Sequence, residues 1–258
     1  MASLYKLFSQ IHSNDQCNNT EELFCFDDKY FIRKYEQTDI DFVNAYFSRG
    51  FNVSLLNEDM RGLFELSFNA FDIVLHTWLS ELPVEKEIIA YGKKVIHAAD
   101  SCADKNEKHN TAEKAALNRL DADALTVINA SSKVQREVHR MMGLLRFSPD
   151  ENGGFSAKCE PDHFILPCLG EYFTSRFGEI AWSIYDVKRN LFLRRCHGEK
   201  AGIYLSPAVT EESVKTDADE WEDLWKHYHK TINNQDRDNP GLQRQFMPQR
   251  YWKYLPEK

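Results

Sequence analysis

Two hairpin signatures interrupt a chain whose apolar residues otherwise repeat at helical spacing, and this order limits the possible folds more than any other feature. The first signature spans residues 146–160, where Gly153 and Gly154 can adopt the positive φ of a tight turn. The second spans residues 182–196. Because helical segments precede and follow the strands, we predict an α+β fold with a mostly helical N-terminal half. The C-terminal half should hold a small antiparallel sheet packed by helices.

The predicted helices rest on apolar residues three and four positions apart. They cover residues 60–80, 83–99, 121–146, 164–177 and 217–232, and two short helices begin at Pro240 and Pro248. A further hairpin is predicted over residues 22–35. Residues 101–118 are polar and form either a loop or a weakly held helix. This segment separates two predicted regions, an acidic and largely helical region of residues 1–120 and an α+β domain of residues 121–258.

The formal net charge of −8 is unevenly distributed along the 258 residues. Residues 1–132 carry −8 and residues 201–224 carry −6, whereas residues 133–200 carry +2 and residues 225–258 carry +4. The total therefore disfavours a protein that coats nucleic acid or an anionic membrane through bulk charge. The two basic segments still leave room for a local nucleic-acid site.

Several classes of protein are disfavoured by missing motifs. The six cysteines are never closer than eight positions apart, so neither a zinc ribbon nor an iron–sulfur cluster is expected. Phosphate-loop, dinucleotide-binding and serine-esterase motifs are absent, and we expect no cofactor and no metal. No segment has the length of a membrane span and the N-terminus lacks a signal peptide's apolar run. These observations predict a cytoplasmic protein with reduced thiols and no membrane contact.

The helix predicted over residues 121–146 has two different faces. An apolar arc should face the core, and it consists of Val134, Val138, Met141 and Leu145. The opposite arc is basic, with Lys133, Arg136, His139 and Arg140. Guanidinium groups pair bidentately with phosphate oxygens, so this face is a candidate nucleic-acid surface together with Arg146. A solvated helix face is the simpler interpretation.

The segment Glu160-Pro-Asp-His connects the first hairpin to the next helix. Asp162 is suited to cap that helix, because its carboxylate can accept hydrogen bonds from free amides of the first turn. Glu160 and His163 are candidate catalytic residues, since a carboxylate can orient an imidazole for acid–base work. We favour the structural cap over catalysis.

The C-terminal segment mixes cations and aromatic rings, and Arg250, Trp252 and Lys253 are its candidate nucleic-acid residues. A packed tail whose cationic stems cover apolar surface is an equally good interpretation. The helix at residues 217–232 carries an apolar stripe that we interpret as core rather than as a platform for bases: Trp221, Leu224, Trp225, Tyr228 and Ile232. On the same helix His227 and His229 are about 200° apart, which argues against a shared metal.

Four segments of the chain resemble a bacterial family of uncharacterised proteins that carries the label "probable DNA metabolism protein". They are residues 133–147 (KVQREVHRMMGLLRF), 160–167 (EPDHFILP), 182–186 (WSIYD) and the C-terminal run from Leu224 to Leu255 with its Met247-Pro-x-Arg-Tyr-Trp-Lys. The resemblance covers about residues 121–258 well and extends weakly through the helical region from residue 60. Family members often begin with a Tyr-Asp-x-x-Phe-Glu-Gly-type strand and helix that this chain lacks or has heavily altered.

The resemblance implies a role in DNA repair without assigning a reaction. Members tend to be encoded beside a radical-SAM protein proposed to modify or repair DNA, and the C-terminal domain also occurs fused to a uracil-DNA-glycosylase-like domain. We therefore expect an accessory protein that binds DNA and works with the radical-SAM protein. One alternative is an enzyme that processes nucleic acid with Glu160 and His163. Another is a module that docks on the partner through residues 1–120 and never contacts DNA.

Overall fold

The computed structural model describes residues 3–13, 35–48, 51–150, 153–205, 218–232 and 239–256. The hairpin predicted over residues 22–35 lies, apart from its last residue, outside this part of the chain. The chain divides into two compact units. The first consists of Met1–Tyr46 and Gly50–Arg136, and the second of Phe47–Arg49 and Glu137–Lys258.

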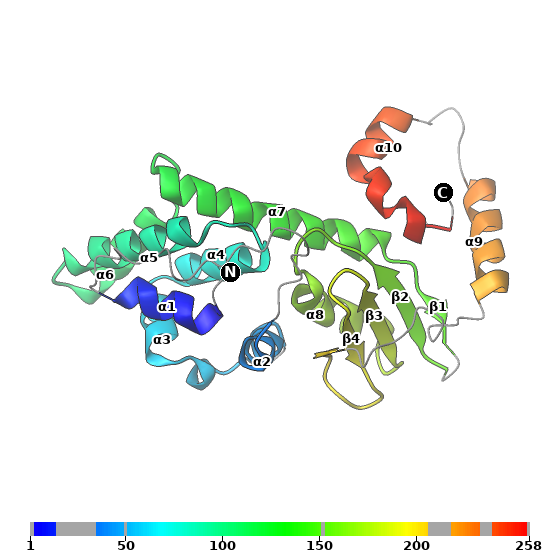
Figure 1. The fold of residues 1–258 in the computed structure, drawn as a ribbon, viewed down its shortest axis with the longest axis horizontal. Helices are drawn as coiled ribbons and strands as arrows, with labels where there is room; N and C mark the ends of the chain where they lie inside the picture. Colours follow the sequence, from blue (N-terminus) through cyan, green and yellow to red (C-terminus); the bar gives the residue numbers. More distant parts are fainter. Residues whose placement is uncertain are drawn as a thin grey trace, which may run out of the picture. The chain divides into compact units, whose positions relative to one another are not determined.

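The described part of the first unit is helical (Figure 1). Its helices are α1 (Leu4–His12), α2 (Gln37–Tyr46), the 3-10 turn η1 (Val53–Leu55), α3 (Glu58–Leu66), α4 (Phe68–Leu79), α5 (Glu85–Asp100), α6 (Lys105–Ala116) and the first part of α7 (Ala122–Leu144). The predicted helix over residues 60–80 is thus two helices. The break is at Ser67, whose hydroxyl caps α4 by accepting a hydrogen bond from the Ala70 amide at 3.0 Å.

The core of the first unit forms where α1, α4 and α5 meet. Phe8 and Phe71 are fully buried, with ring centroids 5.2 Å apart. Trp78 of α4 is 1% exposed. Helix α1 approaches α5 closely at Gly92, where an added Cβ would lie 2.7 Å from a side-chain carbon of Ile11. Glycine at this position therefore permits the helix contact.

Helix α7 has 23 residues and belongs to both units. Its start is fixed by Asp121, whose carboxylate accepts hydrogen bonds from the amides of Asp123 and Ala124, each at 3.0 Å. The helix predicted from Asp121 is therefore confirmed. Its buried residues include Val134 and Met141, as the apolar arc predicts.

The second unit contains a sheet of five strands in the order β1-β2-β3-β4-β5, and the predicted α+β class is confirmed. The strands are β1 (Ser148–Pro149), β2 (Phe155–Cys159), β3 (Trp182–Asp186), β4 (Leu191–Arg195) and β5 (Gly202–Leu205). The sheet is mixed rather than purely antiparallel, because β2 and β3 run parallel. Helix α8 (Leu166–Phe177) lies between them in the sequence and provides the crossover that a parallel pair requires.

Helices α8 and α9 of the second unit both contact strands of this sheet (Figure 1). Phe173 of α8 and Trp182 of β3 are both 2% exposed, with ring centroids 6.0 Å apart. Helix α9 (Ala218–Ile232) contacts β1, and α10 (Pro240–Phe246) precedes the 3-10 helix η4 (Gln249–Tyr254). The two short C-terminal helices predicted at Pro240 and Pro248 are confirmed. Among the described residues, no helix is both long enough and apolar enough to cross a bilayer.

Candidate nucleic-acid interface

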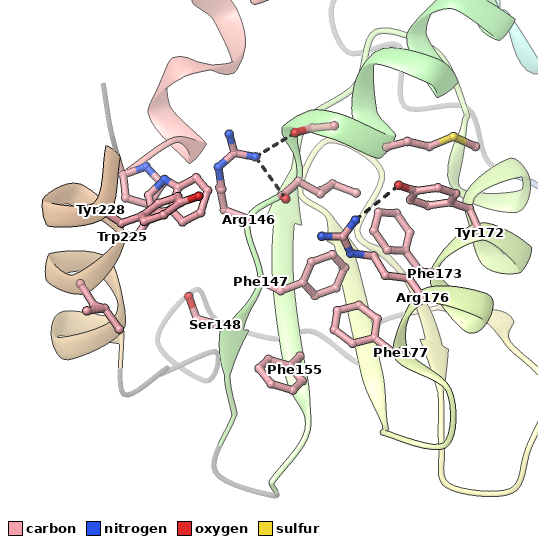
Figure 2. A pocket seen from close by; sticks show the side chains of 15 residues that line it. Arg146, Phe147, Ser148, Phe155, Tyr172, Phe173, Arg176, Phe177, Trp225 and Tyr228 are labelled. Carbon is pink, nitrogen blue, oxygen red and sulfur yellow. Dashed lines mark hydrogen bonds between the residues drawn. The ribbon is translucent and has the colours of Figure 1, made fainter. Parts of the chain in front are cut away.

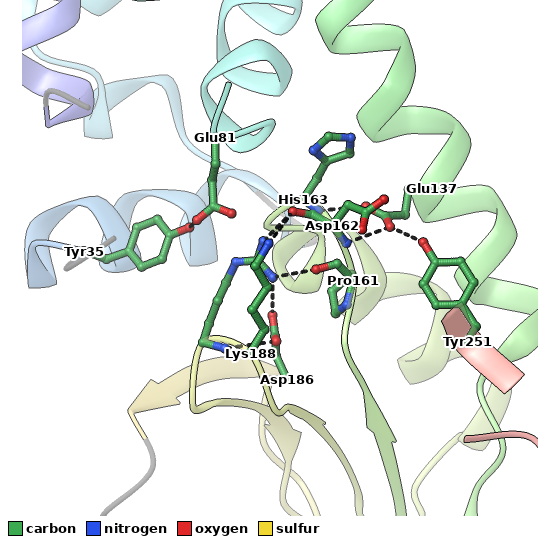
Figure 3. Close-up of polar contacts among 10 residues, drawn as sticks. Tyr35, Glu81, Glu137, Pro161, Asp162, His163, Asp186, Lys188 and Tyr251 are labelled. Carbon is green, nitrogen blue, oxygen red and sulfur yellow. Dashed lines mark hydrogen bonds and ion pairs between the residues drawn. The ribbon is translucent and has the colours of Figure 1, made fainter. Parts of the chain in front are cut away.

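Three segments that carry the family resemblance meet at the buried carboxylate of Glu137 on α7 (Figure 3). The main-chain amides of Asp162 and His163 each donate a hydrogen bond to this carboxylate at 2.9 Å. The hydroxyl of Tyr251, in η4, donates a third. Burial, followed by the hydrogen bond to Glu137, raises the pKa of the Tyr251 phenol well above its ordinary value. Glu137 therefore joins α7, the 160–163 segment and the C-terminal segment at one point.

Two ion pairs also attach the C-terminal segment to the 160–163 segment. Glu160 accepts hydrogen bonds from the Lys253 ammonium and from the Tyr254 hydroxyl, the latter at 3.0 Å. Arg250 forms an ion pair with Asp162 at 2.6 Å. The hydrogen bond from Lys253 lowers the pKa of Glu160 below its ordinary value. We call the pairs Glu137–Tyr251, Glu160–Lys253 and Asp162–Arg250 the C-terminal clasp.

The main chain of the same segment is held from the sheet side. Arg189, in the turn after β3, donates to the carbonyl oxygens of Pro161 at 3.2 Å and Asp162 at 3.0 Å. The same guanidinium pairs with Asp186 at 2.8 Å, and both side chains are at most 4% exposed. Lys188 also donates to the carbonyl of Asp162. Because a buried charge requires a partner, these contacts fix the 160–163 segment firmly against β3.

These contacts change the interpretation of the Glu160-Pro-Asp-His segment. The cap predicted for Asp162 is wrong, because α8 begins four residues later at Leu166 and has no side-chain cap. The Asp162 carboxylate pairs with Arg250 instead. Glu160 contacts Lys253 and Tyr254, while the His163 amide contacts Glu137. An acid–base role for Glu160 and His163 stays a prediction.

A cavity of about 770 Å³ lies between α9 on one side and α8 with β2 on the other (Figure 2). We call it the aromatic cavity. Seven of the side chains that line it are aromatic: Phe147, Phe155, Tyr172, Phe173, Phe177, Trp225 and Tyr228. The two charged residues among its described lining residues are Arg146 and Arg176, and no carboxylate is among them. Pro256, just beyond the clasp, also lines the cavity.

The two arginines contact aromatic residues on opposite walls. The guanidinium of Arg146 lies over the Trp225 ring, 5.1 Å from its centroid. It also donates to the main-chain carbonyls of Gly143 at 2.9 Å and Leu145 at 3.4 Å. Arg176 donates to the Tyr172 hydroxyl at 3.5 Å. The cavity thus offers ring faces beside positive charge, a combination that suits a ligand with both an aromatic and an anionic part.

The interpretation of the apolar stripe on α9 as core is wrong for its described residues. Leu224 is 60% exposed, Tyr228 is 51% exposed and Ile232 is 59% exposed. Trp225 and Tyr228 line the aromatic cavity. Helical spacing marks the stripe as apolar but does not show whether another element covers it.

One of the eight predicted nucleic-acid residues lines the aromatic cavity. Arg146 lines the cavity, and the seven others do not: Lys133, Arg136, His139, Arg140, Arg250, Trp252 and Lys253. The first four lie on α7. Arg250 and Lys253 form clasp pairs, and the Trp252 indole donates to the Met247 carbonyl at 2.8 Å. Contact between these seven residues and nucleic acid stays a prediction.

Sequence reasoning missed Glu137 and Arg176. Glu137 did leave a signal, because on a helical wheel it lies about 40° from Met141, at the edge of the apolar arc. A charged residue in that place predicts a buried polar contact, and Glu137 is 2% exposed. Arg176 left no comparable signal, since it is one exposed cation on α8. Among the described residues, no group of three His, Cys, Asp or Glu side chains is placed to hold a metal ion.

Comparisons with known proteins assign a family. A search of curated proteins and a search of solved structures gave no match. The profile of a family described as a domain of unknown function, DUF4130, matches residues 99–257. The match includes the whole C-terminal clasp and every residue named above for the aromatic cavity. This protein belongs to the DUF4130 family.

Proposed function

We propose that this protein binds unpaired DNA at the aromatic cavity and acts as an accessory factor in DNA metabolism. One observation carries the proposal: seven aromatic side chains and two guanidinium groups line the cavity, with no carboxylate among its described lining residues. Aromatic faces stack on bases of any sequence, and guanidinium groups hold the phosphates beside them.

The local charge supports this proposal despite the acidity of the chain. The formal net charge is −8, and the acidity lies in residues 1–132 (−8) and 201–224 (−6), whereas residues 133–200, which contain both arginines, carry +2. Acidic surface repels a polyanion, so a strand should approach where cations gather without carboxylates. Arg146 and Arg176 meet that condition.

The proposed role in DNA metabolism is based on the family resemblance and not on the cavity. The resemblance implies a radical-SAM enzyme as a partner. In this arrangement the partner supplies the iron–sulfur cluster and the chemistry, and the present chain holds the strand. Glu160 then serves the C-terminal clasp instead of acid–base catalysis.

The test is the binding of a labelled single-stranded oligonucleotide, followed by fluorescence anisotropy across a range of salt concentrations. We expect Arg146→Ala and Arg176→Ala to weaken binding, each reducing the salt slope by about 0.7 for a lost phosphate contact. The matched control is Arg119→Ala, which removes an exposed arginine that does not line the cavity. Undetectable binding at about 50 mM salt would reject the proposal, and so would equal losses in the Arg119 and Arg146 variants.

A further inference from the structure

We infer that the aromatic cavity accepts a single unpaired nucleobase from a DNA strand and does so with little preference among the four bases. The inference rests on the proposed function and goes further, because it names the part of the strand that enters the cavity. It depends on the two walls of the cavity, its size and the chemistry of its polar groups.

The two walls face the space between them from different elements (Figure 2). Trp225 and Tyr228 come from α9, and their ring centroids lie 5.6 Å apart. On the other wall Phe147 packs against Phe173 and Phe177, with centroid distances of 5.0 Å and 4.8 Å. The phenylalanines therefore pack on one another and form an apolar wall opposite the two rings of α9.

The exposed apolar side chains of α9 explain why binding of a flat apolar ligand in the cavity would lower the free energy. Tyr228 is 51% exposed and Leu224 is 60% exposed, although both line the cavity. Apolar surface left in water costs free energy that a covering ring would recover. A planar base that stacks on Tyr228 and Trp225 provides that cover.

The cavity is large enough to hold one nucleotide. Its volume of about 770 Å³ lies within the range of pockets that enclose one small molecule. A paired base is covered on both faces by its neighbours, so it cannot reach the rings. The base must therefore be unpaired, while its flanking phosphates remain near Arg146 and Arg176.

The polar groups of the cavity predict weak discrimination among bases. Apart from the two arginines, the side-chain polar groups on its described lining residues are the hydroxyls of Ser148, Tyr172 and Tyr228 and the indole N–H of Trp225. A hydroxyl can donate or accept a hydrogen bond, so it tolerates any base edge. Arginine can also distinguish guanine, but the proposal places both arginines at phosphates, and the bidentate amides and carboxylates that distinguish bases are missing among these residues.

The experiment compares three labelled blunt-ended DNA duplexes, made from two strands without a loop, that differ at one position. The first is fully paired, the second has a one-nucleotide bulge, and the third has the same bulge with an abasic residue. All measurements use the full chain. We expect the bulged DNA to bind about 5- to 150-fold more tightly than the abasic one, and the four bulged bases to agree within about ten-fold.

Two substitutions of Trp225 test whether the cavity causes the difference in affinity between the bulged and the abasic DNA. Trp225→Ala should remove the advantage of the bulged over the abasic DNA, whereas Trp225→Phe should keep most of it because a ring remains. Phe246→Ala is the matched control, since Phe246 is a 63% exposed ring on α10 outside the cavity.

The outcomes separate this inference from the proposed function. Equal binding of the bulged and abasic DNAs would overturn the single-base inference and leave a phosphate-binding protein. Undetectable binding of all three duplexes and of a single strand would reject the proposed function itself. Deoxyadenosine monophosphate serves as the competitor. If it bound as tightly as the bulged DNA, the ligand would be a free nucleotide, and the assignment to a strand would be wrong.

Discussion

Tyr251 donates a hydrogen bond to the buried carboxylate of Glu137, which lies 114 positions earlier in the chain. Both side chains are 2% exposed. The same carboxylate accepts two main-chain amides from residues 162 and 163. This contact closes the C-terminal clasp, and Pro256, five residues after Tyr251, lines the aromatic cavity.

The Tyr251→Phe substitution should destabilise the full chain by about 1.5–3 kcal/mol, because it removes a hydrogen bond to a buried charged group. Glu137→Ala should cost more, since two amides and a phenol then lose their acceptor. Urea denaturation followed by circular dichroism measures both values. Tyr228→Phe is the control, because Tyr228 is 51% exposed and should change stability little. An unchanged unfolding midpoint for Tyr251→Phe would contradict the clasp.

The clasp should weaken in acid. Hydrogen bonding from Lys253 lowers the pKa of Glu160 below its ordinary value of 4.5. A carboxylate with a lowered pKa in the folded state contributes stability that is fully present above pH 4.5. That contribution is lost as the pH falls through the lowered value. In Lys253→Met, a nuclear magnetic resonance titration should place the pKa of Glu160 higher than in the unmodified protein. An unchanged pKa of Glu160 in this variant would show that Lys253 does not cause the lowered pKa.

The basic face of α7 should contribute to DNA binding through charge alone. Replacing Arg136 and Arg140 together should reduce the salt slope for a single strand by about 1.4, or about 0.7 for each phosphate contact. The base dependence should not change, because neither residue lines the cavity. Anisotropy titrations at several salt concentrations measure the slope. A slope equal to that of the unmodified protein would show that this face is a solvated surface.

The enzyme alternative has its own test. If the protein only holds DNA, incubation with damaged and undamaged oligonucleotides should leave both intact, and His163→Ala should give the same product profile. Denaturing gel electrophoresis of end-labelled strands reports any cleavage or base loss. A product formed by the unmodified protein and missing with His163→Ala would establish catalysis and replace the accessory role.

Much of the fold could be predicted because its determinants are local. The first turn of α7 depends on Asp121, which caps amides two and three positions away. The direction of β2 relative to β3 depends instead on a crossover through α8, and residue alternation within a strand does not encode it. The division between α3 and α4 at Ser67 is local too, but a cap inside a continuous apolar pattern is easily overlooked.

The site was harder to predict because its residues converge from distant segments. Periodicity identified the apolar stripe on α9, yet the exposure of Tyr228 depends on what packs against that helix. Likewise Arg146 and Arg176 are 30 positions apart in the sequence, and only the fold places both at one cavity. Spacing can indicate a face of a helix, but it does not indicate which faces meet.

Helix α7 belongs to both compact units, and this limits how the chain can be divided. A fragment that began at Glu137 would start in the middle of the helix and lose the cap at Asp121. Glu137 would then lie in the first turn, and the first turn of a helix frays. The carboxylate that accepts the three hydrogen bonds of the clasp would no longer be held in place. The smallest fragment that keeps the clasp intact should therefore begin at or before Asp121, so part of the first unit must accompany the second.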